Sequence, residues 1–154
     1  MKDIDEAFPV NLKTKEILIP GTGNEPVNFT SARDMARAIV NLVQAPKGSW
    51  EKYTWVSGER ASWNVVADVV RERYPDLKVV GYRSLYQLVK DLVTAGDNEE
   101  AQLLAEFRIF SVSGAGGLDE GEVLRQREKF FEGIRFRGLR EVMEEAERKP
   151  DSIV

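Results

Sequence analysis

Hydrophobic residues recur along this chain with two periods, one typical of strands and one typical of helices. Short runs rich in apolar and β-branched residues predict strands at 16–20, 27–30, 53–56 and 77–82. Apolar residues three and four positions apart predict helices at 31–44, 62–74, 84–96, 98–111, 120–133 and 138–148. Residues 1–14 have no clear period and predict an irregular lead-in or a short helix.

Five of the predicted helices carry an apolar face that we expect to point into a core. The first two faces are Met35, Ile39, Leu42 and Val43, and then Val65, Val66, Val69 and Val70. The other three are Leu85, Leu88, Val89, Leu92 and Val93; Leu103, Leu104, Phe107 and Phe110; and Leu139, Val142, Met143 and Ala146. Ser31 with Asp34 three residues later, Ser62 and Ser84 are the expected helix caps.

The order of these elements predicts an α/β fold. Strands alternate with helices in the first half, which favours parallel pairing through crossovers. The last third is helical throughout. We therefore expect a small, incomplete sheet of few short strands, partly parallel, with about six helices. At 154 residues, the size predicts a single domain, 1–154.

Composition excludes several classes of function. The net charge of −4 argues against a nucleic-acid partner, because such proteins carry basic excess or a basic stripe. No apolar run reaches the roughly 18 residues of a membrane span, so no membrane partner is expected. The acids in the first residues, MKDIDEAF, are unlike a signal peptide. These features predict a cytoplasmic protein.

The chain contains no cysteine and no histidine, which restricts its chemistry further. Disulfides, thiol nucleophiles, histidine triads and zinc sites with histidine or cysteine ligands are excluded. A general acid or base must be Asp, Glu, Lys or Tyr. No metal site is predicted.

Three stretches of the sequence carry a family resemblance. They read PGTGN at 20–24, NFTSARDMARAIVNLV at 28–43 and WEKYTWVSGE at 50–59. Over residues 17–86 the chain resembles the C-terminal half of the NmrA-like, isoflavone-reductase-type atypical short-chain dehydrogenases/reductases, especially fungal members. The resemblance implies a substrate-binding part that, in the family, lies beside a nucleotide-binding sheet.

The cofactor site of that family is missing from this sequence. A dinucleotide site needs G-x-G-x-x-G between a strand and a helix, so that backbone amides can approach the pyrophosphate. Here Gly21 and Gly23 are followed by Pro26 where the third glycine would stand. The stretch predicts a tight turn, and no cofactor is expected.

Three residues are candidates for catalysis. Tyr86 and Lys90 spell the Tyr-x-x-x-Lys of short-chain dehydrogenases and would lie one helical turn apart. The resemblance puts this pair in the wrong part of the chain, so an ordinary Tyr and a solvated Lys are the alternative. Glu59 follows a predicted strand, and open α/β sheets bind ligands at the carboxyl ends of strands.

Aromatic residues gather in the middle third of the chain. Such side chains can line an apolar pocket with polar handles, and they can equally build the core of a small domain. The resemblance favours the pocket, since the corresponding region of the family helps to form its substrate site. The candidate substrate-binding residues are Trp50, Tyr53, Trp55, Trp63 and Tyr82.

Two further features have a functional and a structural interpretation. The glycine-rich run 113–117 can form an anion-binding nest of amides or a mobile interhelical loop. Arg135 and Arg137, on either side of Phe136, can bind a carboxylate or simply lie on the surface.

The leading functional prediction is a small-molecule enzyme derived from an NmrA-like reductase without its cofactor half. It would promote a cofactor-independent, non-redox step, such as cyclisation, isomerisation, dehydration or ring opening. From the fungal relatives, the resemblance implies a hydrophobic substrate of secondary metabolism. The alternatives are a non-catalytic NmrA-like binding or regulatory module, for which a homodimer is the expected assembly, and a fragment of an NAD(P)-dependent oxidoreductase.

Overall fold

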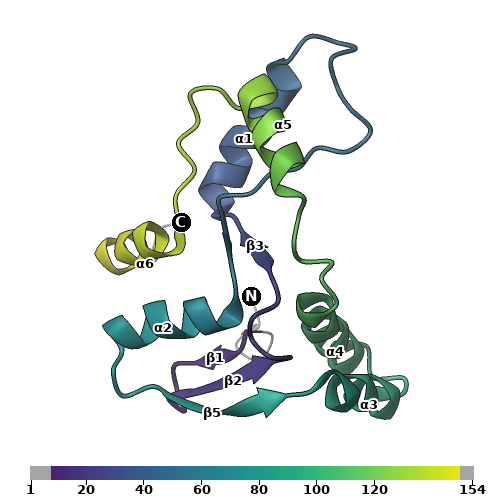
Figure 1. Cartoon of the computed structure of the whole chain (residues 1–154), viewed down its shortest axis with the longest axis vertical. Helices are drawn as coiled ribbons and strands as arrows, with labels where there is room; N and C mark the ends of the chain where they lie inside the picture. The colour runs from purple at the N-terminus through teal and green to yellow at the C-terminus, as the bar shows by residue number, and fades with distance from the viewer. Residues whose placement is uncertain (1–7, 150–154) are drawn as a thin grey trace. The chain divides into compact units, whose positions relative to one another are not determined.

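A computed structural model describes residues 8–149 of the chain. Figure 1 shows its helices and strands. The chain divides into two compact units. Unit 1 comprises residues 1–27 and 61–117, and unit 2 comprises residues 28–60 and 118–154. The prediction of a single domain stays a prediction.

Unit 1 is built on a three-stranded mixed sheet in the order β1–β2–β5. Strand β1 (Val10–Asn11) pairs antiparallel with β2 (Glu16–Pro20), which pairs in parallel with β5 (Lys78–Arg83). The register between β2 and β5 shifts at Ile17/Leu18. Parallel neighbours need a crossover connection, and helix α2 (Trp63–Arg73) lies in it.

Three helices complete unit 1, and each begins at a polar cap. Ser62 caps α2, Ser84 caps α3 (Leu85–Ala95) and Asn98 caps α4 (Glu99–Val112). In each case the cap side chain accepts a hydrogen bond from a backbone amide of the first turn. Helices α3 and α4 lie side by side at one end of the sheet, as Figure 1 shows.

The core of unit 1 lies between β2 and its helices. Ile17 and Ile19, alternate residues of β2, are buried. The buried side chains of the helices and of the residue before β5 are Trp63, Val66, Ala67, Val69, Val70, Leu77, Leu88 and Ala105. Burial of each large apolar side chain contributes about 1.5–3 kcal/mol, which outweighs the low helix propensity of the valines in α2.

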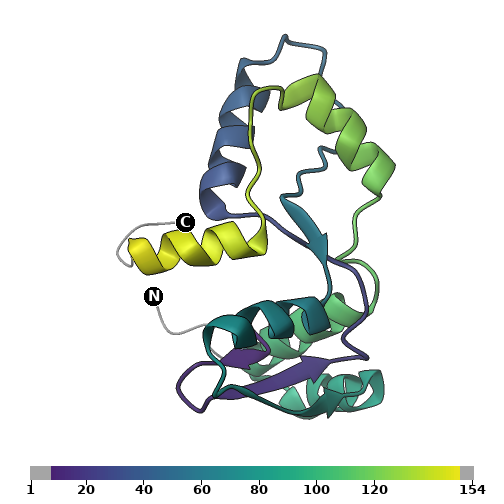
Figure 2. The ribbon, with the colours of Figure 1, turned by 60° about the vertical axis from the view of Figure 1, so that its left-hand side comes forward.

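Unit 2 contains three helices and most of a two-stranded sheet. Strands β3 (Val27–Phe29) and β4 (Glu59–Ala61) pair, and the helices are α1 (Ala32–Gln44), α5 (Glu120–Phe130) and α6 (Leu139–Arg148). Figure 2 shows the long connection between α1 and β4 and the segment that joins α5 to α6. The core consists of Ala38, Phe130 and Phe131, with Leu42, Ala45, Val56, Ile134 and Phe136 packed against it.

The predicted fold class is confirmed. The described residues form six helices and small sheets of two and three strands, with a helical C-terminal part. All six predicted helices are present, and the hydroxyls of Ser31, Ser62 and Ser84 cap them as expected. The expected reciprocal cap by Asp34 is wrong, since its carboxylate binds Arg137 instead. In the lead-in, the short strand β1 replaces the expected irregular or helical structure, and residues 1–7 lie outside the described part.

The strand predicted at 53–56 is wrong, since the strand of this region is β4, at 59–61. The backbone at 53–55 is bound by a side chain instead of a neighbouring strand. The buried amide of Gln126 donates to the Tyr53 carbonyl (3.0 Å) and accepts from the Trp55 amide (2.6 Å). A segment with the composition of a strand becomes one only where a neighbouring strand is available for its backbone hydrogen bonds.

Several predicted core faces are also wrong. Only Leu88 of the predicted face of α3 is buried, while Leu85, Val89 and Val93 are exposed. In α4 the buried residues are Ala105 and Ser111, and Leu103, Phe107 and Phe110 are exposed. In α1 they are Asp34 and Ala38, with Met35, Ile39 and Val43 exposed. Helical spacing identifies an apolar face but not whether anything packs against it.

Candidate functional site

Unit 1 contains a cavity of about 280 Å³ that opens to the surface. Strands β1, β2 and β5, the segment before β1, the start of α2, and helices α3 and α4 form its walls. The described lining residues are Phe8, Pro9, Asn11, Thr14, Glu16, Leu18, Pro20, Trp63, Val80, Arg83, Leu88, Arg108 and Ser111. Its volume is near the lower end of the range for small-molecule sites, about 300–1,000 Å³. We call this cavity the Trp63 pocket.

Strand alternation and aromatic packing give the Trp63 pocket its apolar wall. In β2, Glu16, Leu18 and Pro20 line the pocket, whereas Ile17 and Ile19 between them do not. The ring of Phe8 contacts Trp63 edge-on, with 6.0 Å between ring centroids, and also lies 6.2 Å from the ring of Phe107. The contact between Phe8 and Trp63 gives the pocket an aromatic part of its wall.

Polar groups of both charges also line the Trp63 pocket. Arg83 is oriented by Asp91, whose carboxylate lies 2.6 Å from its guanidinium nitrogen. Arg108 comes from α4, and Glu16 is the carboxylate among the described lining residues. The pocket can therefore bind an apolar molecule that carries an acidic or carbonyl oxygen, with a proton acceptor at hand.

The structure brings one of the five predicted substrate-binding residues to this pocket. Trp63 lines it and is 2% exposed. Tyr82 also belongs to unit 1, but it is exposed and its hydroxyl donates to Asn64 Oδ1 at 3.3 Å. Trp50, Tyr53 and Trp55 belong to unit 2. The assignment of these residues to one site stays a prediction.

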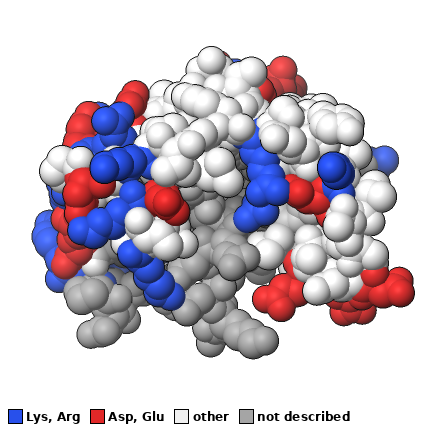
Figure 3. All heavy atoms as spheres, turned by 90° about the horizontal axis from the view of Figure 1, so that it is seen from below, with Lys and Arg blue, Asp and Glu red and all other residues white. Residues whose placement is uncertain are grey.

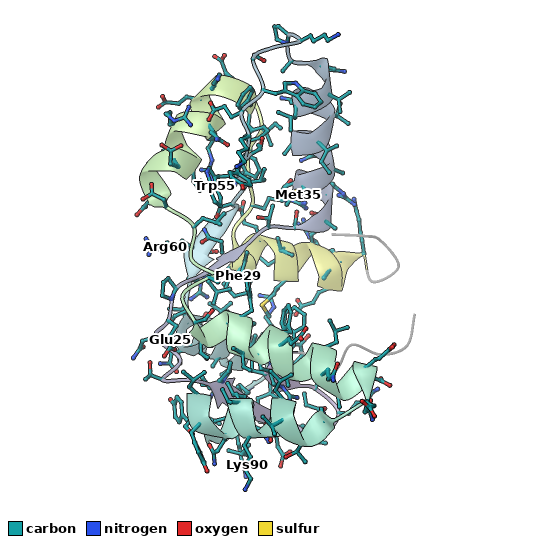
Figure 4. The ribbon with its side chains drawn as sticks, turned by 90° about the vertical axis from the view of Figure 1, so that its right-hand side faces the viewer. Glu25, Phe29, Met35, Trp55, Arg60 and Lys90 are labelled. Carbon is teal, nitrogen blue, oxygen red and sulfur yellow. The ribbon has the colours of Figure 1, made fainter. Side chains whose placement is uncertain are left out.

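The predicted catalytic pair, Tyr86 and Lys90, lies on the surface of α3. Tyr86 is 77% exposed, and Lys90 points outward from the helix (Figure 4). Both lie outside the described lining of the Trp63 pocket. The pair shares unit 1 with the pocket, whereas the third candidate, Glu59, belongs to unit 2.

Glu59 has a clear structural contact in unit 2. Its Oε2 atom accepts a hydrogen bond from the backbone amide of Leu139, at 2.6 Å. Leu139 is the first residue of α6, whose cap residue Gly138 has no side chain to offer. A carboxylate at this end satisfies a free amide and interacts favourably with the helix dipole.

Replacing Glu59 with alanine should therefore lower the free energy of unfolding by about 1 kcal/mol, because the Leu139 amide at the start of α6 loses its side-chain acceptor. Urea unfolding followed by circular dichroism measures the change. Glu128→Ala, at an exposed position of α5, is the matched control and should change stability by less than about 0.5 kcal/mol. Equal stability of the two variants would contradict the capping role of Glu59.

A buried network of charges connects α1 with the segment before α6 in unit 2. Asp34 is fully buried and accepts hydrogen bonds from the backbone amide and the Nε atom of Arg137, both at 3.0 Å. Arg137 also donates to Ser31 Oγ (2.6 Å) and pairs with Glu145, which in turn pairs with Arg33. Arg137 is therefore engaged within the protein.

The network determines the ionisation of its members. Burial opposes the charge of Asp34, but hydrogen bonds from Arg137 and Ser31 outweigh it and lower the pKa of the carboxyl. The carboxylate of Asp34 in turn raises the pKa of Arg137. Both side chains are therefore charged at neutral pH and are bound to each other.

Comparisons with known proteins connect this fold to a class of enzymes. Over its whole length the chain is 43% identical to oxidoreductase swnR of Arthroderma benhamiae and 41% identical to oxidoreductase swnR of Metarhizium robertsii. A 62-residue stretch, 38% of the chain, is 32% identical to oxidoreductase BOA1 of Botryotinia fuckeliana and covers 20% of it. The chain is related to fungal proteins named oxidoreductases. No family model matches the sequence.

The extent of these matches matters for what they imply. The chain spans about half the length of the two swnR relatives, 50% of each. The identities of 43% and 41% over the whole chain confirm the predicted relationship to fungal oxidoreductases. The narrower assignment to the NmrA-like branch stays a prediction, as does any activity of the whole relatives in this chain.

Sequence reasoning missed most of the Trp63 pocket. The signals were present in two elements: Glu16 precedes the apolar run of β2, and Arg108 interrupts the apolar spacing of α4. The pairing of β2 with β5, which brings Val80 and Arg83 into the same wall, could not be read from the sequence.

In the described part of the chain no helix is long and apolar enough to cross a membrane. Within that same part, no cluster of three or more potential metal ligands occurs.

Proposed function

We propose that the chain binds a hydrophobic small molecule in the Trp63 pocket and promotes a cofactor-independent, non-redox proton transfer on it. The observation that carries the proposal is the combination of an apolar wall with Glu16, Arg83 and Arg108 in one cavity. Small-molecule sites combine apolar walls with polar groups that orient the ligand. The catalytic group assigned here is Glu16, in place of Tyr86, Lys90 and Glu59.

The reaction that suits these groups is an isomerisation next to a carbonyl. The aromatic wall orients the molecule, and the guanidiniums of Arg83 and Arg108 stabilise the negative charge that develops on its carbonyl oxygen. Glu16 takes a proton from the neighbouring carbon and returns it at another carbon of the same molecule. The formula of the substrate is unchanged, and no electron passes to a nicotinamide.

Binding can be tested with 2-naphthoate, a flat apolar carboxylate, by isothermal titration calorimetry. We expect millimolar or tighter binding to the wild-type chain and at least tenfold weaker binding to Val80→Glu, which places a like charge in the pocket wall. Val65→Glu is the matched control, because Val65 is an exposed valine of unit 1 outside the lining. Equal affinity of the two variants, or no binding to wild type, would overturn the proposal.

A second function is favoured by the comparisons: substrate binding for a redox reaction whose cofactor is held by other residues. The named oxidoreductases are about twice as long as this chain, so they have room for a cofactor-binding part. Calorimetry of this chain with NADPH tests the cofactor-independent step, since the second function expects the cofactor to bind residues outside this chain. Micromolar binding of NADPH to this chain would overturn the cofactor-independent step and leave 2-naphthoate binding as a separate result.

A further inference from the structure

Unit 2 contains an open hollow of about 560 Å³ between α1 and the segment that follows α5. Figure 2 shows this segment returning along α1 on its way to α6. Arg33, Ala36, Arg37, Val40 and Asn41 of α1 form one wall, and residues 132–135 form the other. We call it the Arg37 hollow. Its volume lies within the range for small-molecule sites, about 300–1,000 Å³.

The core of unit 2 holds both walls of the Arg37 hollow. Ala38 of α1 is buried together with Phe130 and Phe131 at the end of α5, and Ile134 packs against the same cluster. The Ile134 amide donates to the Phe131 carbonyl at 3.0 Å, which closes a turn after α5. Gly133 lies in this turn with a φ of +81°, a conformation that glycine adopts readily. Buried contacts and a tight turn therefore hold the two walls in place.

The charged groups of the Arg37 hollow are mostly cationic. Its described lining carries three arginines, Arg33, Arg37 and Arg135, and one acid, Glu132, which gives a formal charge of +2. The whole chain, in contrast, has a net charge of −4. A local excess of positive charge in a hollow raises the concentration of small anions there.

Carboxylates beside the hollow pair with these arginines and still leave donors for a ligand. Arg37 Nη1 contacts Asp34 Oδ1 at 3.2 Å, and the same carboxylate accepts from the backbone amide and Nε of Arg137. One buried carboxylate thus serves two guanidiniums. The Arg37 side chain is 55% exposed, and its guanidinium carries five N–H donors. Arg135 pairs with Glu141 and is 83% exposed.

We propose that the Arg37 hollow binds a small organic dianion, a phosphate monoester or a dicarboxylate. Guanidiniums on both walls, Arg37 and Arg135, bind its anionic groups, because their planar forks match phosphate and carboxylate oxygens. Asn41, one turn beyond Arg37, offers a neutral polar contact. The apolar part of the molecule lies against Ala36 and Val40. The site belongs to unit 2 and does not depend on the Trp63 pocket or on the proposed proton transfer.

Calorimetry of the full chain with phenyl phosphate and with phthalate tests the proposal. The titrations are run at about pH 8, well above the second pKa of a phosphate monoester, about 6, so that both probes are dianions. We expect at least one probe to bind wild type with a dissociation constant of about 1 mM or below. Tighter binding of phenyl phosphate would identify a phosphate monoester as the ligand, and tighter binding of phthalate a dicarboxylate. No binding of either probe would overturn the proposal.

Variants assign the binding to the hollow. Arg37→Gln and Arg135→Gln should each weaken it at least about tenfold, since each removes charged hydrogen-bond donors. Arg60→Gln is the matched control and should stay within about twofold of wild type. Arg60 is also an arginine of unit 2, is 44% exposed and pairs with Glu120, but lies outside the described lining. Circular dichroism confirms that the variants fold.

The Trp63 pocket also contains arginines, so it needs its own control. Val80→Glu, in the wall of that pocket, should leave binding of the dianion within about twofold of wild type. Loss of binding in Val80→Glu but not in Arg37→Gln would place the dianion in the Trp63 pocket. Equal weakening by Arg37→Gln, Arg135→Gln and Arg60→Gln would show unspecific attraction. Either result would overturn the proposal and leave the 2-naphthoate test unaffected.

Discussion

Replacing Asp34 with alanine should lower the free energy of unfolding by about 3–5 kcal/mol, because it leaves the charge of Arg137 without its main partner. Asp34 is fully buried, and the Arg137 side chain is only 12% exposed. The variant also removes the acceptor of the Arg137 backbone amide. Urea unfolding measures the loss, and Asp68→Ala, an exposed acid of α2, is the control and should stay within about 0.5 kcal/mol of wild type.

Two further measurements separate the ion pair from a general packing defect. In a double-mutant cycle with Arg137→Ala, the combined loss should be clearly smaller than the sum of the single losses. Additive losses would contradict the pairing. The pH dependence gives an independent test, because the folded-state pKa of Asp34 lies below its unfolded-state value.

The sign of that dependence follows from linkage. The stabilisation from Asp34 is complete above the unfolded pKa of an aspartate, about 3.9, and is lost as the pH falls through the lower folded pKa. The stability difference between wild type and Asp34→Asn should therefore be constant from pH 7 to about pH 5 and shrink as the solution is acidified further. A difference that grows with acidification would contradict the assignment.

Replacing Phe131 with alanine should also lower the free energy of unfolding by about 3–5 kcal/mol, because it opens a cavity in the core of unit 2. Phe131 is 2% exposed and contacts the rings of Phe130 and Phe136, with centroids 6.1 and 6.0 Å away. Leu124→Ala, at an exposed position of α5, is the control. Similar midpoints of urea unfolding for both variants would show that the Phe131 cluster does not stabilise unit 2.

The surface of unit 1 has its own unassigned feature. On the face drawn in Figure 3, uncharged side chains occupy a broad area between groups of charges. Exposed apolar residues of β5 and α3 include Val80, Tyr82, Leu85, Tyr86 and Val93. Strand β5 is also an edge strand, where pairing with another chain can occur. The homodimer expected for a binding module would use such an edge, and light scattering of the chain alone tests it.

Part of the fold followed from the sequence because it depends on local rules. Helix caps at Ser31, Ser62 and Ser84 need only a side-chain oxygen three residues before a free amide, so spacing was enough to predict them. Strand β2 followed from its apolar run and from the Pro–Gly turn that ends it. The absence of histidine and cysteine fixed the range of available chemistry without any structure.

Tertiary structure alone decided which apolar faces are covered, whether 53–56 is a strand, and where a cavity forms. Each of these depends on contacts between residues far apart in the chain: β2 with β5 for the Trp63 pocket, Gln126 with Tyr53 and Trp55, and Arg137 with Asp34. Periodicity reports what a segment can bury or pair with. The free energy is gained only where a partner is present, and that partner is not encoded in the segment itself.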